Sequence, residues 1–180
     1  MDGARYTNAH HVRDDAKLNA STFANVALTP FTGLTAWQYQ NFSAAQLSNA
    51  NISAPLADAN ADSVNNLLAY AAGLTPWTAA TAANGGRTFA TSASGRLAIT
   101  FARSTTNTDL TLTAQGADSP AGPWTDLARS TGGAVFAVIT SGATATESGT
   151  GATRTVEVRD AFLTSDPAHP RRFLRVQVLH

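Results

Sequence analysis

The first candidate for chemistry is a cluster of metal-competent side chains near the N-terminus. His10 and His11 are adjacent, and Asp14 and Asp15 follow them closely. Adjacent residues point in different directions on a helix or strand, whereas His11 and Asp15 lie four residues apart and would share one helix face. We interpret the cluster as part of a solvated arm rather than as a metal site.

Two tryptophans are candidates for binding carbohydrate. Trp77 follows a proline directly after an expected helix, and Trp124 follows a Gly-Pro pair where a strand is expected to start. Exposed aromatic rings can stack on sugar faces, but a tryptophan rarely leaves its large apolar area in solvent. We therefore expect both to pack helices on a sheet, and we keep carbohydrate binding as an alternative.

Residues for catalysis are sparse. The chain has no cysteine, no Gly-x-Ser-x-Gly elbow for a serine nucleophile and no phosphate-binding glycine loop. Glycosidase chemistry needs two opposed carboxylates, and the two glutamates, Glu147 and Glu157, are expected in a turn and a strand. The sequence therefore predicts a protein without catalytic activity.

The charge balance narrows the possible partners. The chain has twelve Lys and Arg residues and twelve Asp and Glu residues, so its formal net charge is zero. A nucleic-acid binder would show a basic face, whereas zero net charge removes self-repulsion and makes self-association easier. The longest apolar run, 134–139, is far too short to span a membrane. The first residues lack the apolar core of a signal peptide, so we expect an intracellular chain or a mature piece of a secreted one.

Residues 1–34 are expected to form an extended N-terminal arm. Phe23, Val26, Leu28 and Phe31 give an alternating pattern that ends near a proline. Such a segment is too short to fold alone and too apolar to remain free in solvent. We expect it to add to a sheet edge, in its own chain or in a neighbouring one.

The next segment predicts helices. Thr35 is a candidate N-cap, and Ser43 is expected to cap a second short turn. Asp62 or Ser63 is expected to start the clearest helix, 64–72, and Gly73 to end it. The helix should bury a stripe at helical spacing, formed by Val64, Leu67, Leu68 and Ala71. The side chains expected to pack the helices on a sheet are Trp37, Phe42, Leu67, Leu68 and Tyr70.

From about residue 88 onward the apolar period changes to two, which is typical of strands. Five to seven strands with turn residues between them indicate an antiparallel sandwich. The clearest segments are 97–102, 110–112, 135–140, 153–159 and Phe173–Leu179. The predicted fold class is α+β, a short helical unit packed on an antiparallel β-sandwich. Its parts are an arm (1–34), a helical segment with a degenerate aspartate loop (35–85) and the sandwich (86–180).

One series of residues resembles a known module. It includes Trp37, Phe42, an Ala-Asp-Ala-Asn-Ala-Asp stretch (57–62), Asn-Leu-Leu-Ala-Tyr-Ala-Ala-Gly (66–73) and Arg-Phe-Leu-Arg-Val (172–176). This series resembles a C-terminal module of large secreted proteins of Verrucomicrobia-type bacteria, whose helical signature runs ADPDGDGLSNLLEYALG. The resemblance covers about residues 35–180. It implies secretion and an accessory role, and it implies no catalysis.

The aspartate stretch of that module looks like a calcium loop. Alternating carboxylates can wrap a cation, a glycine allows the sharp turn and a later glutamate closes the site. This chain keeps Asp58, Asn60 and Asp62, but Ser63 replaces the turn glycine and Ala69 replaces the glutamate. We therefore interpret the stretch as a capping turn at a helix start, with weak calcium binding as the alternative.

These observations favour a non-catalytic accessory or attachment module of a secreted or cell-surface bacterial protein. Two alternatives remain open. One is a structural subunit that self-assembles into an extracellular layer or filament, and the other is a carbohydrate-binding module. The expected partners are other protein chains or further copies of this chain, with polysaccharide as a possibility, and neither nucleic acid nor a membrane span is expected.

Overall fold

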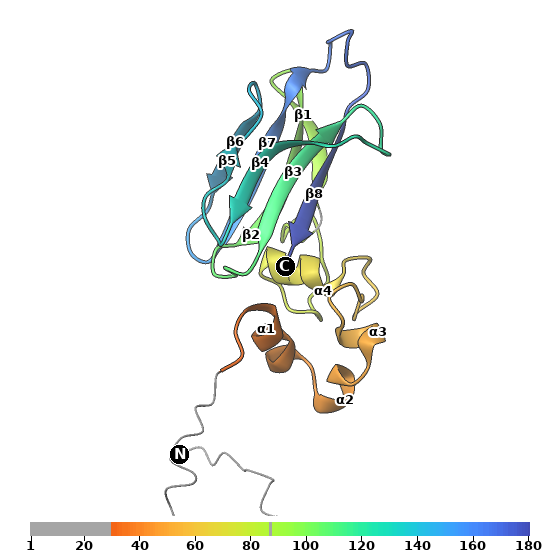
Figure 1. Ribbon diagram of the computed structural model, residues 1–180, viewed down its shortest axis with the longest axis vertical. Helices are drawn as coiled ribbons and strands as arrows, with labels where there is room; N and C mark the ends of the chain where they lie inside the picture. The colour runs from red at the N-terminus through yellow and green to blue at the C-terminus, as the bar shows by residue number, and fades with distance from the viewer. Residues whose placement is uncertain (1–29, 87) are drawn as a thin grey trace, which may run out of the picture. The chain divides into compact units, whose positions relative to one another are not determined.

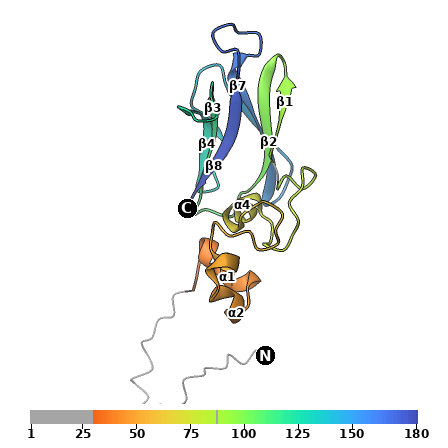
Figure 2. The same cartoon turned by 90° about the vertical axis from the view of Figure 1, so that its right-hand side faces the viewer.

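The computed structural model describes residues 30–86 and 88–180 (Figures 1 and 2). Four short helices come first, and eight strands follow them in the described residues. The helices are α1 (Gly33–Asn41), α2 (Ala44–Leu47), α3 (Ala50–Ser53) and α4 (Asn66–Ala72). The strands are β1 (Phe89–Ala93), β2 (Arg96–Ser104), β3 (Thr111–Ala117), β4 (Thr125–Thr131), β5 (Ala137–Val138), β6 (Thr144–Ser148), β7 (Thr153–Leu163) and β8 (Phe173–Leu179).

The strands form two four-stranded antiparallel sheets. One has the order β1-β2-β7-β6 and the other the order β5-β4-β3-β8. Figure 1 shows the sheets one behind the other, with the helices gathered at one end of the sandwich. The predicted α+β class, a helical unit packed on an antiparallel sandwich, is confirmed.

The core lies between the two sheets, where the inward residues of each strand meet. Val156 and Val158 of β7 are fully buried, and Phe101 of β2 packs edge-on against Phe136 with ring centroids 5.5 Å apart. Alanines at the centres of β2, β3 and β4 are also fully buried. Burying this apolar surface is the main favourable contribution to folding of the sandwich.

Two of the predicted helix starts are wrong. The cap of α1 is Thr32 and not Thr35, and α4 begins at Asn66 with Asn65 as its cap, not at Asp62 or Ser63. The Asn65 side chain accepts a hydrogen bond from the backbone N–H of Leu68 at 2.9 Å, as a capping residue does. The predicted cap at Ser43 is confirmed by a reciprocal capping box with Gln46, and Gly73 ends α4 at a positive φ of 76°.

The buried face of α4 differs from the predicted stripe. Leu68 is exposed, whereas the buried positions include Ala69 and Tyr70. The later start leaves Val64 outside the helix and makes the Tyr70 side chain the main inward contact. Trp37 and Leu67 pack against the core beside it, and Phe42 is buried, so Leu68 is the one incorrect member of the predicted packing set.

The apolar run 135–140 was expected to form a strand and forms only the two-residue β5. Val135 and Ile139 are 71% and 50% exposed, and Val138 is 48% exposed. The run therefore carries three large apolar side chains on the outside of the molecule. Only Phe136 turns inward, into the core.

The expected N-terminal arm lies almost wholly outside the described residues. Its edge-strand prediction, built on Phe23, Val26 and Leu28, is therefore untested. Phe31 is described; it is exposed, and its ring stacks on Tyr39 with centroids 4.4 Å apart. Among the described residues, no helix is long and apolar enough to cross a membrane.

Candidate functional site

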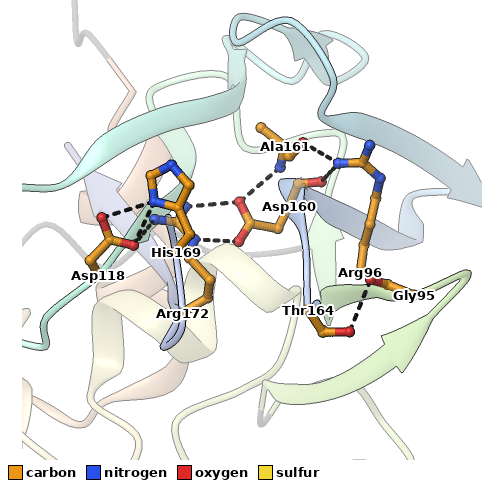
Figure 3. A network of polar contacts seen from close by, with 8 residues as sticks. All are labelled: Gly95, Arg96, Asp118, Asp160, Ala161, Thr164, His169 and Arg172. Carbon is orange, nitrogen blue, oxygen red and sulfur yellow. Dashed lines mark hydrogen bonds and ion pairs between the residues drawn. The ribbon is translucent and has the colours of Figure 1, made fainter. Parts of the chain in front are cut away.

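A cluster of charged side chains lies where β3, β7 and the β7–β8 connection meet. We call it the end clasp, and Figure 3 shows it from close by. Asp118 directly follows β3, Asp160 lies near the end of β7, and His169 and Arg172 come from the connection. Arg96 of β2 joins from the other side of Asp160 by donating to the backbone carbonyls of Asp160 and Ala161.

Arg172 is the centre of the end clasp. Its Nε and Nη2 donate to the two carboxylate oxygens of Asp160 at 2.6 and 2.9 Å, and its Nη1 donates to Asp118 at 2.9 Å. The Asp160 side chain is completely buried and that of Arg172 nearly so. The hydrogen bonds to Asp160 raise the pKa of Arg172, although burial alone would lower it. A planar guanidinium suits this two-pronged contact, which fixes orientation as well as charge.

A cavity of about 220 Å³ lies beside the end clasp, with Phe162 and His169 in its wall. Their rings stack with centroids 3.6 Å apart, and the guanidinium of Arg172 lies 4.9 Å from the Phe162 ring centre. His169 Nδ1 lies 3.0 Å from a carboxylate oxygen of Asp118. Hydrogen bonds from Arg172 and then His169 lower the pKa of Asp118. The charged groups are thus engaged with one another and hold the connection onto both sheets.

A second polar cluster joins the helical unit to the sandwich. Asp109 accepts hydrogen bonds from the Tyr70 hydroxyl at 2.6 Å and from the backbone N–H of Leu34 at 2.7 Å, and His180 Nε2 lies 3.1 Å away. Burial, then the hydrogen bond and the charge of Asp109, raise the pKa of Tyr70 far above its usual value. Burial also pulls the pKa of Asp109 upward, but the hydrogen bonds from Tyr70 and Leu34 outweigh it and lower that pKa.

A third cluster joins the two sheets directly. Arg103 of β2 donates to both carboxylate oxygens of Glu147 on β6, at 3.0 and 2.9 Å, and to the carbonyl of Gly133 at 3.0 Å. Glu147 also accepts the backbone N–H of Phe136 at 2.8 Å. Gly133 and Phe136 belong to the β4–β5 connection of the other sheet, so this pair bridges the sandwich.

These three clusters were not predicted from the sequence. A signal was present for two of them, because a charged residue continues an inward apolar alternation. Asp160 follows Val156 and Val158 at a spacing of two, and Arg103 follows Phe101 in the same way. A charge at an inward position must be paired, since burying a lone ion costs far more than folding provides.

The residues of the predicted calcium loop do lie together, and their carboxylate oxygens accept hydrogen bonds from backbone N–H groups. Asp58 accepts the N–H groups of Asp62 and Ser63, while Asp62 accepts those of Val64 and Ala80. The Asn60 side-chain amide donates to Asp62 at 3.0 Å. Within the described residues, no group of three His, Asp or Glu side chains is placed to hold a metal ion.

The backbone of this loop is the kind that glycine favours. Ala61 and Ser63 have φ values of 57° and 71°, in the left-handed region that side chains with a Cβ disfavour. Both stand where the resembled signature has glycine. Ala69, which replaces the closing glutamate of that signature, is buried, so its side chain faces the interior.

The two predicted ligand-binding tryptophans lie in different surroundings. Trp77 is 44% exposed, packs edge-on against Phe42 and donates from Nε1 to the Asn41 carbonyl at 2.9 Å. Trp124 is partly buried, and the guanidinium of Arg175 lies 4.1 Å from its ring centre. The structure therefore does not bring them into one site, and Arg175 occupies a face of Trp124. The N-terminal His and Asp cluster lies outside the described residues.

The fold and the three polar clusters together define a class of protein. It is an α+β protein whose helical unit covers one end of a two-sheet sandwich, and its buried charged side chains join the sheets to each other and to the helical unit. No family model, curated protein or solved structure matches this chain.

Proposed function

We propose that this chain is a non-catalytic accessory module that attaches a secreted or cell-surface bacterial protein to other protein. The observation that carries the proposal is a group of exposed apolar side chains close together in the sequence, Val135, Val138 and Ile139, all about half exposed or more. Neighbouring apolar side chains on the surface of a soluble domain are typical of protein interaction sites. These residues lie in and beside β5, at one edge of the sandwich (Figure 1).

The use of the charged groups also supports a binding role. The buried pairs Asp160–Arg172 and Arg103–Glu147 are taken up by contacts that hold the fold. Among the described residues, every buried side-chain nitrogen and oxygen has a hydrogen-bond partner. Charged side chains whose hydrogen bonds are all made within the protein stabilise the fold, whereas a catalytic side chain must be able to contact a substrate. The resemblance to secreted C-terminal modules points in the same direction.

Two measurements on the natural protein test the proposal. We expect a cell fractionation to place it outside the cytoplasm, and its mass to exceed the 18.6 kDa of this chain substantially. A triple variant, Val135→Ser with Val138→Ser and Ile139→Ser, should release the protein from its partner into the soluble fraction. The matched control is Leu56→Ser with Phe31→Ser, which removes exposed apolar side chains elsewhere. A cytoplasmic protein of 18.6 kDa, or equal release by both variants, would overturn the proposal.

Carbohydrate binding is the second candidate, and one observation favours it. The Trp77 indole is exposed and is held in place by Phe42 and by its bond to Asn41. A fixed, exposed ring loses little entropy when a sugar stacks on it. Retention on an insoluble polysaccharide that is lost with Trp77→Ala, and kept with Trp124→Ala, would establish this function in place of protein attachment.

A further inference from the structure

β8 is a long edge strand of its sheet. All seven of its residues pair with β3 in an unbroken register, from Ala117 opposite Phe173 to Thr111 opposite Leu179. In the part of the chain that the structure describes, β8 pairs with no other strand. The edge strand at the other side of this sheet, β5, has two residues. An edge of seven residues presents a row of free backbone donors and acceptors, which another strand can bind.

The usual features that block an edge strand are missing from β8. It contains no proline, glycine or lysine, and its pairing with β3 has no bulge. Its one charged side chain, Arg175, leans back across its own sheet. The guanidinium donates to Gln115 on β3 at 2.8 Å and lies against the Trp124 ring. The charge is therefore held away from the free edge.

A groove with both polar and apolar walls runs beside the free edge of β8. Its volume is about 420 Å³, and its walls include inward side chains of β8 (Val176 and Val178) and the core residues Phe101 and Leu112. The groove lies on the side where β8 pairs with no strand of the described residues, and α4 and the segment before β1 form part of its wall. A further strand added to β8 would place its own inward side chains over this groove.

The sequence of β8 matches itself in reverse. If two copies of the strand run antiparallel with Val176 opposite Val176, each apolar residue meets an apolar one and Arg175 meets glutamine instead of a second arginine. Residues directly opposite each other share one face of a sheet, so inward residues also meet inward ones. The resulting pairs are Phe173 with Leu179, Leu174 with Val178, Arg175 with Gln177, and Val176 with itself.

We propose that a second copy of this chain binds the free edge of β8, with the two β8 strands antiparallel and a twofold axis at Val176. The two sheets then form one continuous eight-stranded sheet, and Leu174, Val176 and Val178 of each copy cover the groove of the other. A closed twofold pairing of this kind uses the same surface on both copies and does not grow into a filament. Zero net charge leaves no long-range repulsion against it. The inference is independent of the attachment role, which uses the opposite edge.

Cysteine cross-linking of the full chain tests the register. The chain has no cysteine, so Val176→Cys introduces a single thiol on the proposed axis. Directly opposite residues have Cα atoms about 4.5–5.5 Å apart, which suits a disulfide. The control is Leu179→Cys, a more exposed thiol whose counterpart would lie six residues away, about 20 Å. We expect oxidised glutathione to link Val176→Cys into dimers and to leave Leu179→Cys monomeric.

Charge substitutions on the solvent face give a second test, which does not disturb the groove. In the proposed register Phe173 of one copy lies opposite Leu179 of the other, twice in the dimer, and both side chains are exposed. Phe173→Lys with Leu179→Glu places an ion pair at each of these positions, and Phe173→Lys with Leu179→Lys places two like charges there. Sedimentation equilibrium at low salt should show dimerisation about two- to thirtyfold tighter for the variant with opposite charges than for the variant with like charges. Equal cross-linking of both cysteine variants, or the same association constant for both charge variants, overturns the proposal. A chain that stays monomeric in every variant overturns it as well.

Discussion

At the scale of single residues, the Asp160 carboxylate is the charge most fully removed from water, and Arg172 neutralises it. The two side chains are 0% and 8% exposed. Removing one member of such a pair leaves the other buried and uncompensated, which typically costs about 3–5 kcal/mol. Asp160→Ala should therefore lower the free energy of unfolding by about that amount, as measured by urea denaturation at neutral pH.

Asp118 provides the matched control for Asp160. It binds the same arginine, but its carboxylate is 53% exposed. Pairs of this kind typically contribute less than about 1 kcal/mol, because water and salt screen them. Asp118→Ala should thus cost much less stability than Asp160→Ala. If both alanine variants lost the same stability, the buried Asp160–Arg172 contact would not be the tie that the geometry indicates.

The Tyr70–Asp109 hydrogen bond should make stability depend on pH in a defined direction. The pKa of Asp109 is below its ordinary value of 3.8 in the folded protein, so its contribution is complete above that value and is lost as the pH falls through the folded pKa. The pKa of Tyr70 is raised from 10.0, so its contribution is complete below pH 10.0 and is lost as the pH rises through the folded pKa.

Tyr70→Phe tests that dependence. At neutral pH the substitution should cost about 1–3 kcal/mol, because a charged acceptor loses a donor. The cost should shrink in acid, where Asp109 becomes protonated in wild type and variant alike. Tyr39→Phe, at an exposed hydroxyl, is the control and should cost little at any pH. A Tyr70→Phe cost that stays the same from neutral pH into acid would contradict the assignment.

At the scale of elements, the loop before α4 holds two non-glycine residues in a conformation that glycine adopts freely. The left-handed conformation costs such a residue about 1–2 kcal/mol, and glycine loses about 0.5–1 kcal/mol of entropy in exchange. Ala61→Gly and Ser63→Gly should therefore each raise the free energy of unfolding by about 0.5–1 kcal/mol. Thermal and urea unfolding measure this. Ala45→Gly, inside α2, should lower stability, and a loss at all three sites would show that φ is not the controlling factor.

The packing of α4 on the sandwich predicts different stability losses when the adjacent leucines Leu67 and Leu68 are truncated. Leu67 packs against the core, whereas Leu68 is 37% exposed. Truncating a leucine costs transfer free energy plus the cavity that it leaves. We expect Leu67→Ala to cost about 2 kcal/mol and Leu68→Ala clearly less, by chemical denaturation. The opposite order would restore the stripe predicted from helical periodicity.

The elements also show how far the sequence could predict this fold. β8 and the end of α4 follow from alternation and from Gly73, which are local signals. β4 and β6 did not emerge, because Thr125–Thr131 holds one large apolar residue and Thr144–Ser148 holds none. Their pairing comes from neighbouring strands that are distant in sequence. The contact between Asp109 and Tyr70 was missed for the same reason, since 39 residues separate them and only the fold brings them together.

At the scale of the whole molecule, the two sheets depend on a buried ion pair as well as on the apolar core. Arg103 and Glu147 come from one sheet, and they hold Gly133 and Phe136 of the connection in the other. The arginine is 2% exposed and the glutamate 11%. The pair therefore links the two sheets at the β5 edge of the sandwich, opposite the β8 edge.

Glu147→Ala should lower the free energy of unfolding of the whole sandwich. It removes two bonds to Arg103 and the acceptor for the Phe136 N–H, so we expect a loss of about 3–5 kcal/mol. Glu157→Ala is the control, because its pair with Arg159 lies on the surface of a single strand. Amide hydrogen exchange should show faster exchange at Phe136 in the first variant and unchanged exchange there in the second. Replacing both partners, Arg103→Met with Glu147→Leu, should recover part of the loss, since an apolar pair leaves no charge uncompensated. A double variant less stable than Glu147→Ala would mean that the charges themselves, and not only the filled volume, hold the two sheets in register.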